Sequence, residues 1–313
     1  MKFTLKTTAT LALTLVLLFS ITLTGFAKDK DTTINFGYVQ WPGVTVKTHV
    51  VKKISEYLGY ETKMTAGAQA LMFQGMDSGD LDVFLGNWLP TMKLHYDKYK
   101  KKGTVKNVRV NLFDVVYKTA VPKYVWDAGV KSFKDLQKNA EKFDKTIYGI
   151  EPGNEGNLII KKAIKNNKYN LKDWQLKPSS TAGMLSAVKK HINDKEWVAF
   201  NAWKPHYMNV LFDIKYLKDP EGIWASGERV YTTIRTSFEK EDPNFYHFLE
   251  QFKVTAPIQN RWIDSYKRKG KSPETVAENW IKNNLDIVNQ WVYGVETLDG
   301  KMARKVIKQK VKN

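Results

Sequence analysis

The chain has 313 residues, a net charge of +18 and no cysteine. The absence of cysteine excludes disulfides, thiolate metal sites and cysteine nucleophiles, and the length is sufficient for two domains of ordinary size. The lysines are spread along nearly all of the expected helices and are not gathered with aromatic residues into one stripe, so the positive charge does not indicate nucleic-acid binding.

Residues 1–27 have the three parts of a secretory signal peptide. Lys2 and Lys6 precede an apolar run over 11–23, and small residues follow it up to Ala27. The apolar run is too short for a secure membrane anchor. We therefore expect export to the periplasm, with cleavage after Ala27.

The next part of the chain alternates between strand and helix patterns. Val46, Val50 and Ile54 recur with helical spacing ahead of Gly59, which is typical of a helix with one buried face. The expected elements are a strand over 33–41, a helix over 44–58, a strand over 61–65, a helix over 71–77, a strand over 80–85, a helix over 92–101 and a strand over 108–117.

A second cycle of the same kind follows, and a helical region ends the chain. The expected elements of the cycle are a helix over 133–140, a strand over 146–150, a helix over 155–166, a strand over 174–176, a helix over 182–192 and a strand over 197–200. The helices expected after it cover 242–253, 258–269, 273–283 and 284–291. The basic tail over 301–312 is expected to be a frayed, solvated end.

Two pairs of segments repeat in the same order. VFLGNWLP over 83–90 matches VAFNAWKP over 198–205, and each is a strand pattern that ends in Trp-x-Pro. INFGYVQWPG over 34–43 matches TIYGIEPG over 146–153, and each runs into a Pro-Gly turn. The repeats predict an α/β fold of two similar lobes with the functional site between them, because open α/β sheets bind ligands at the C-terminal ends of their strands.

The repeats also suggest where the lobes begin and end. We expect the signal peptide over 1–27, a first lobe over 28–117, a second lobe over 118–213, and a return over 214–313 that completes the first lobe and adds C-terminal helices. Two lobes joined by crossing strands follow from this division.

Four aromatic residues are expected at the cleft. Trp41, Trp88 and Trp203 come at the C-terminal ends of strands, and Tyr117 lies near the expected crossing point. A single tryptophan at such a position is usually part of a core, but in the repeated Trp-x-Pro of Trp88 and Trp203 a proline two residues later ends the strand and holds the indole at the sheet edge. Several rings facing one cavity attract a cation that has no hydrogen-bond donors, such as a quaternary ammonium group.

Two helix starts complete the candidate site. The amides of Gly43 and Val44 open a helix after Pro42, and such unpaired amides at the positive end of a helix can bind a carboxylate. Asn154 opens the corresponding helix of the second lobe, either as its N-cap or as a ligand contact, with Glu155 in the first turn to balance the helix dipole.

These motifs resemble a known family. YVQW over 38–41, GNWLP over 86–90, Tyr117, PGN over 152–154 and AWKP over 202–205 are similar, in this order, to the substrate-binding proteins of ABC importers for glycine betaine, proline betaine and choline. The resemblance covers about residues 33–291. It implies a bilobal periplasmic binding fold of type II and delivery of the ligand to a membrane permease driven by an ATPase.

The resemblance also assigns roles to the candidate residues. It implies a trimethylammonium group boxed by Trp41, Trp88, Tyr117 and Trp203, with the polar end of the ligand near Gly43, Val44 and Asn154. Choline-binding relatives carry an acidic residue two places after the first tryptophan, where this chain has Gly43. This difference favours glycine betaine as the ligand, and choline, carnitine and proline betaine remain alternatives.

Other classes of function have less support. The five histidines have no serine or aspartate partner at a catalytic spacing, and no pattern suggests a metal site, so we expect neither an enzyme nor a bound metal or cofactor. A sugar-binding or amino-acid-binding protein of the same fold is the closer alternative. Such ligands need acidic or amide side chains beside the rings, and the segments over 41–45 and 88–92 offer neither.

Overall fold

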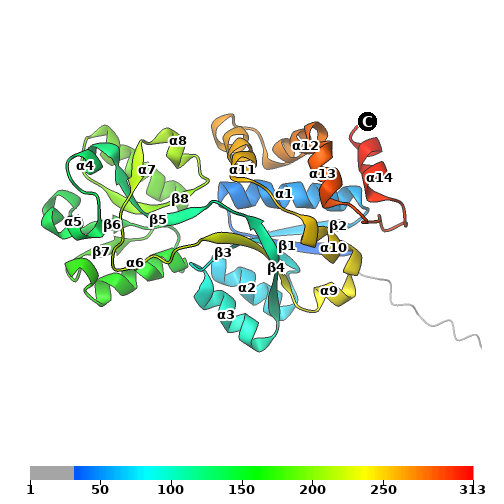
Figure 1. Cartoon of the computed structure of the whole chain (residues 1–313), viewed down its shortest axis with the longest axis horizontal. Coiled ribbons are helices and arrows are strands. Elements are labelled where there is room, and N and C mark those ends of the chain that lie inside the picture. The colour runs from blue at the N-terminus through cyan, green and yellow to red at the C-terminus, as the bar shows by residue number, and fades with distance from the viewer. Residues whose placement is uncertain (1–31, 313) are drawn as a thin grey trace, which may run out of the picture. The chain divides into compact units, whose positions relative to one another are not determined.

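Two five-stranded sheets form the framework of residues 32–312, the part of the chain that the computed structural model describes (Figure 1). The expected signal peptide over 1–27 lies outside the described residues. Within 32–312 no helix has both the length and the apolar character needed to cross a lipid bilayer.

The first sheet has the strand order β2-β1-β3-β10-β4. Its strands, in chain order, are β1 (Thr33–Tyr38), β2 (Glu61–Ala66), β3 (Val83–Leu89), β4 (Val105–Leu112) and β10 (Arg229–Arg235). β1 pairs in parallel with β2 and β3, whereas β10 is antiparallel to β3 and β4.

The second sheet repeats this arrangement with the order β7-β6-β8-β5-β9. Its strands are β5 (Val116–Pro122), β6 (Thr146–Tyr148), β7 (Gln175–Lys177), β8 (Ala199–Lys204) and β9 (Ile214–Tyr216). β6 is parallel to β7 and β8, and β5 is antiparallel to β8 and β9. The repeated sequences lie on equivalent strands, β1 with β6 and β3 with β8, so the prediction of two similar α/β halves is confirmed.

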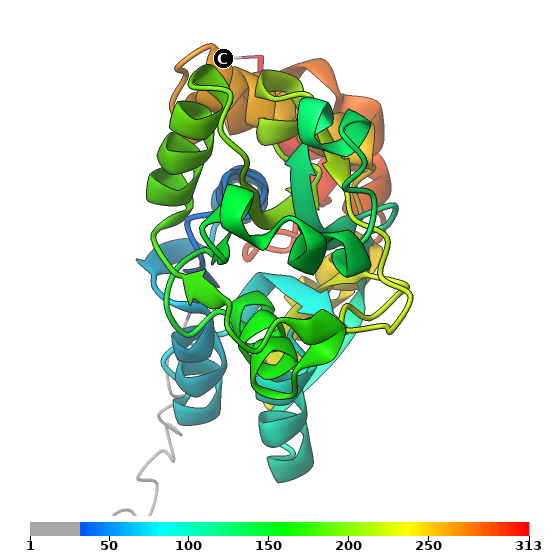
Figure 2. The ribbon, with the colours of Figure 1, turned by 90° about the vertical axis from the view of Figure 1, so that its left-hand side faces the viewer.

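Helices surround each sheet (Figure 1). Those beside the first sheet are α1 (Pro42–Tyr57), α2 (Gln69–Ser78), α3 (Lys93–Lys102), α9 (Phe238–Glu241), α10 (Pro243–Gln251), α11 (Ala256–Ile263), α12 (Pro273–Asn283), α13 (Leu285–Trp291) and α14 (Ala303–Lys310). Those beside the second sheet are α4 (Lys123–Asp127), α5 (Phe133–Lys138), α6 (Glu155–Lys165), α7 (Thr181–Asn193) and α8 (Met208–Leu211). In Figure 2 the second sheet and its helices, in green, lie in front of the first sheet and its helices, in blue and orange.

The strand expected over 108–117 is two strands in different sheets. β4 ends at Leu112 and β5 begins at Val116. Asp114 between them has a φ of 56°, in the left-handed region, which is incompatible with a continuous strand. The chain therefore changes sheet over 113–115.

The chain returns to the first sheet over 217–228, between β9 and β10. β10 was not expected from the sequence, yet it lies between β3 and β4. The lobe ranges 28–117, 118–213 and 214–313 remain a prediction, and by sheet membership β9 goes with the second sheet.

The basic tail over 301–312 is not the frayed end that we expected. Ala303 and Ile307 in α14 are fully buried, and Val311 is 9% exposed. These residues are four apart, so they form one apolar stripe on the helix, and α14 packs against α1 and α13. Lysines and Arg304 on the other sides of this helix obscure the apolar stripe in the sequence.

Helix α1, which lies beside the first sheet, carries a buried lysine. Lys47 is fully buried, and its Nζ donates to Asn111 Oδ1 at 2.6 Å and to the carbonyl of Leu85 at 3.4 Å. Burial lowers the pKa of Lys47 to about 7. The lysine thus links α1 to β3 and β4, below the end of α1 that lines the site.

We expect Lys47→Met to change the pH dependence of stability. Because the pKa of Lys47 is lower in the folded state than in the unfolded state, Lys47 destabilises the fold progressively as the pH falls from about 10 to about 7. Below pH 7 this penalty is complete and constant. Urea unfolding of both proteins should show that the variant loses less stability than the wild type over that range. Lys63→Met on the exposed part of β2 is the control, and a pH-independent difference for Lys47→Met would contradict the explanation.

Candidate functional site

A pocket that encloses about 430 Å³, measured out to its open rim, is lined by residues from both halves of the molecule. All seven residues that the sequence singled out line it: Trp41, Gly43, Val44, Trp88, Tyr117, Asn154 and Trp203. The structure therefore brings these residues together, while their role in binding remains a prediction.

Tyr117 stands between two of the tryptophans. Its ring centroid lies 6.4 Å from that of Trp88 and 5.7 Å from that of Trp203, with interplanar angles of 70° and 75°. Trp224 packs against the same tyrosine at 5.0 Å and does not line the cavity. Trp88, Tyr117 and Trp203 are thus inclined to one another at the wall of the cavity.

Sheet register fixes where these rings lie. Tyr117 and Trp203 are direct cross-strand partners on β5 and β8, and Trp88 pairs with Val230 on β3 and β10. Directly opposed residues of antiparallel strands have closely spaced side chains on one face of the sheet. Both Trp-x-Pro segments have a cis peptide bond before the proline, at Pro90 and Pro205.

Gly156 allows Tyr117 to approach the start of α6. A Cβ built on Gly156 would lie 2.6 Å from Cζ of Tyr117, so a larger residue would force the ring to move. The Tyr117 hydroxyl donates to Asn154 Oδ1 at 3.1 Å. Burial raises the pKa of Tyr117 well above its ordinary value, and the carboxyl groups of Glu151 and Glu228 raise it further, so the phenol is a neutral donor.

Trp41 is held from the opposite half. Its Nε1 donates to Glu151 Oε1 at 2.9 Å, from the first half to the turn after β6. A carboxylate that accepts this bond makes the indole ring more negative, which strengthens its attraction for a cation. The four expected rings are all buried, with 6 to 8% of their surface exposed.

The start of α1 provides unpaired amides at the cavity. Trp41 is the N-cap of this helix, its side chain makes no capping hydrogen bond, and no acidic residue occupies the first turn. The first-turn amides of a helix have no partner within the helix. Gly43 and Val44, which carry such amides, line the cavity.

Asn154 is the N-cap of α6, which is one of the two roles that the sequence suggested for it. Its Oδ1 accepts from the amide of Gly156 at 2.8 Å and from Tyr117, and its Nδ2 donates to Gln69 Oε1 at 3.1 Å and to Glu151 Oε1 at 3.4 Å. These bonds use both lone pairs and both protons of the carboxamide. Asn154 can therefore hydrogen-bond a ligand only if one of these four bonds is broken.

Glu155 joins the two halves, although we expected it to serve its own helix. It is 4% exposed, and its carboxylate accepts from the amides of Leu94 and His95 at 3.0 and 2.9 Å and from Gln69 Nε2 at 3.1 Å. His95 Nδ1 lies within hydrogen-bonding distance of the same carboxylate. Glu155 in α6 therefore supplies the cap of α3, whose own N-cap residue, Met92, makes no capping hydrogen bond with its side chain.

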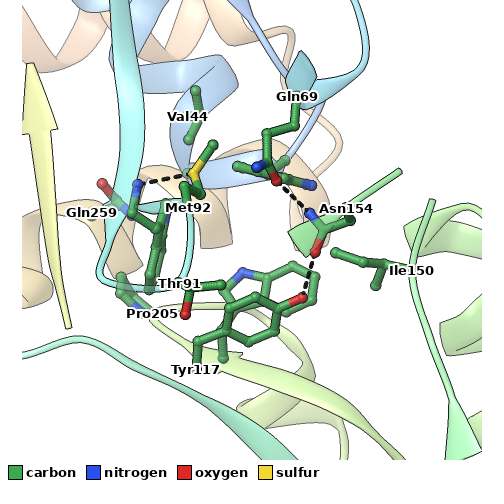
Figure 3. A pocket seen from close by; sticks show the side chains of 13 residues that line it. Val44, Gln69, Thr91, Met92, Tyr117, Ile150, Asn154, Pro205 and Gln259 are labelled. Atoms are coloured by element: carbon green, nitrogen blue, oxygen red, sulfur yellow. Dashed lines mark hydrogen bonds between the residues drawn. The ribbon is translucent and has the colours of Figure 1, made fainter. Parts of the chain in front are cut away.

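Six further residues line the cavity and were not expected from the sequence. They are Gln69, Thr91, Met92, Ile150, Pro205 and Gln259, all of which are labelled in Figure 3. Pro205 is the proline of the second Trp-x-Pro segment and Thr91 directly follows the first, so both could have been found there. Gln69 and Gln259 are ordinary helix residues in sequence, and no local signal identifies them.

The lining has no ionisable side chain except the tyrosine. Among residues 32–312, no group of three or more histidine, aspartate or glutamate side chains is placed to hold a metal ion. The cavity thus offers aromatic faces, helix amides and neutral carboxamides, a combination suited to an organic cation that also has a polar end.

Comparison with known proteins identifies the family. The family model for the substrate binding domain of the ABC-type glycine betaine transport system matches residues 32–283. The chain belongs to this family. Its members are substrate-binding components of importers and not enzymes, so the expected lack of enzymatic activity is confirmed by membership.

Solved structures of this substrate-binding family are similar over most of the chain. An ABC-transporter choline binding protein in complex with choline is 31% identical, has a TM-score of 0.87, and covers 90% of this chain and 98% of its own. Lactococcal OpuAC, closed and complexed with glycine betaine, is 31% identical with a TM-score of 0.75, over 83% of this chain and 98% of its own. These matches confirm the expected bilobal type II binding fold.

A curated relative in this family is the glycine betaine/carnitine transport binding protein GbuC of Listeria monocytogenes. It is 36% identical over 167 residues, which are 53% of this chain and 54% of GbuC, so the chain spans about half the length of that relative. Substrate-binding proteins of ABC importers are extracytoplasmic, whereas periplasmic location and cleavage after Ala27 remain predictions.

One buried carboxyl group lies directly behind the site of this substrate-binding protein. Glu228 is 8% exposed, and its Oε1 accepts from the amide of Thr91 at 3.0 Å and from the Thr91 hydroxyl. Its Oε2 has no hydrogen-bond partner within the described residues. Burial raises the pKa of Glu228 to about 7.

We expect Glu228→Gln to stabilise the protein at pH 8 but not at pH 4.5. The folded state holds the Glu228 proton more tightly than the unfolded state, so stability falls as the pH rises from about 4.5 to about 7 and stays low above it. The shift corresponds to at most roughly 3 kcal/mol. Chemical unfolding at both pH values measures it, with Glu61→Gln on exposed β2 as the control. An equal effect of Glu228→Gln at both pH values would refute the assignment.

Proposed function

We propose that this chain captures a quaternary ammonium compound, glycine betaine first, and delivers it to the permease of an ABC importer driven by its ATPase. The ammonium group would be enclosed by Trp41, Trp88, Tyr117 and Trp203. The observation that supports this most directly is the convergence of these rings, from both halves, on one cavity without a charged lining residue. Such an enclosure suits a methylated cation, which has no N–H group to satisfy.

The energies explain why the ligand needs a second, polar attachment. Four cation-π contacts supply roughly 2 to 8 kcal/mol before binding costs. Micromolar affinity needs about 8 kcal/mol net, and association itself is costly. The polar end of the ligand should therefore contribute, and the uncapped start of α1 at Gly43 and Val44 favours a carboxylate there.

The relatives bind related compounds, and this leaves choline, carnitine and proline betaine as alternative ligands. The absence of an acidic side chain at Gly43 supports glycine betaine over choline. A sugar or an amino acid is a more distant alternative. The cavity has more amide groups than the sequence indicated, but Gln69 and Asn154 are bonded to each other and Gln69 is also bonded to Glu155.

Calorimetric titration of residues 28–313 with glycine betaine and with choline, followed in parallel by tryptophan fluorescence, tests the proposal. Tight binding of betaine with weak binding of choline supports an ammonium box with an anion site. The reverse order keeps the box and removes the carboxylate preference, and binding of neither compound rejects the proposed function.

Trp203→Ala should weaken betaine binding at least tenfold without unfolding the protein. Loss of one ring removes a cation-π face and opens the box to water, and tenfold corresponds to about 1.4 kcal/mol. Calorimetry gives the dissociation constant and circular dichroism checks the fold. Trp126→Ala, on α4 and outside the cavity, is the matched control. An unchanged dissociation constant for Trp203→Ala would count against the box.

A further inference from the structure

Gln259 is the lining residue whose hydrogen bonding is least complete. It comes from α11, far along the chain from the other lining residues, and it is 2% exposed. Its Oε1 is buried and has no hydrogen-bond partner within residues 32–312. A buried acceptor without a partner is costly, and the described residues do not fix the carboxamide through its oxygen.

The carboxamide of Gln259 lies against the start of α1. A Cβ built on Gly43 would be 2.9 Å from Cδ of Gln259 and nearer still to Nε2. Gln259 therefore occupies the space that any side chain at position 43 would use. This packing gives a physical reason for glycine at the position that the sequence comparison singled out.

The other two amides of the cavity are already engaged. Figure 3 shows the chain of hydrogen bonds from Gln69 through Asn154 to Tyr117, with Gln259 outside it. Gln259 is thus the carboxamide that this chain of hydrogen bonds does not hold, and its Nε2 lies in the space beside Gly43 at the start of α1. An N–H of the side chain and N–H groups of the helix start together form a set of donors, which complements a carboxylate.

We propose that Gln259 is a specificity-determining residue, which donates from Nε2 to the carboxylate of the bound betaine beside the first-turn amides of α1. The inference rests on the proposed function and names the group that selects the polar end. Rotation of the carboxamide would instead present Oε1 as an acceptor for a hydroxyl, so betaine and choline are the pair of ligands that tests which end is recognised.

The deciding experiment compares the dissociation constants of glycine betaine and choline at pH 8 for the wild type and Gln259→Glu. The substitution keeps the shape and puts a negative charge where the carboxylate would bind. We expect betaine to bind at least tenfold more weakly and choline to change by less than threefold. Gln251→Glu on α10, which does not line the cavity, carries the same change of charge and should leave both constants unchanged.

The outcomes separate this inference from the proposed function. Equal weakening of both ligands, or no change for either, overturns the role of Gln259 while wild-type binding upholds the proposed function. If the wild type binds neither compound, both fail. Gln259→Leu covers the case in which the charged variant does not fold, because it removes the donor without adding charge and should still weaken betaine selectively.

A double-mutant cycle tests the contact with Gly43. Gly43→Ala should weaken betaine binding at least fivefold in the wild type, because the new methyl group displaces the carboxamide. In the Gln259→Ala background the same change should cost less than twofold, since the space is then open. The same loss in both backgrounds would overturn the coupling between the two residues.

Discussion

The contact of Glu155 with the start of α3 holds the two halves of the molecule against each other. Its carboxylate accepts from two α3 amides and from Gln69, so a group of the second half completes two elements of the first. A charge this deeply buried is stable only when its hydrogen bonds are complete. Because Asn154 directly precedes Glu155, the same contact sets the Asn154 cap, and through it the Tyr117 hydroxyl, at the wall of the cavity.

The carboxyl groups near the site belong to residues behind its lining. Glu151 lies behind Trp41 and Glu228 lies behind Thr91, while the surface that a ligand would touch carries no carboxylate. In a protein with a net charge of +18, these two carboxyl groups are therefore hydrogen-bonded to residues that line the cavity. The carboxyl groups favour a cation by their field without offering it a hydrogen bond, which suits a fully methylated nitrogen.

The sequence predicted the parts of the site that repeat locally and missed those that depend on packing. Trp88 and Trp203 could be found because each ends a strand pattern with Trp-x-Pro, and parallel neighbours bring such ends together. Gln259 could not, because its place depends on how α11 packs against α1 across more than two hundred residues of sequence. β10 was missed because Thr232 and Thr233, both fully buried, interrupt the apolar pattern of the strand. The burial of α14 was missed because its basic residues, Arg304 included, outnumber its apolar residues.

The order of strands along the chain has a consequence for the order of folding. The second sheet is built entirely from the continuous stretch 116–216, whereas the first needs β10, at Arg229–Arg235, between strands that end by Leu112. Contacts between distant parts of a chain form more slowly than local ones, because a longer loop must be closed first. The second half can therefore assemble as soon as its own residues are available. The first half, with Gln259 and the α1 end of the cavity, is completed only when the C-terminal third of the polypeptide docks, so the selective part of the site is the last to form.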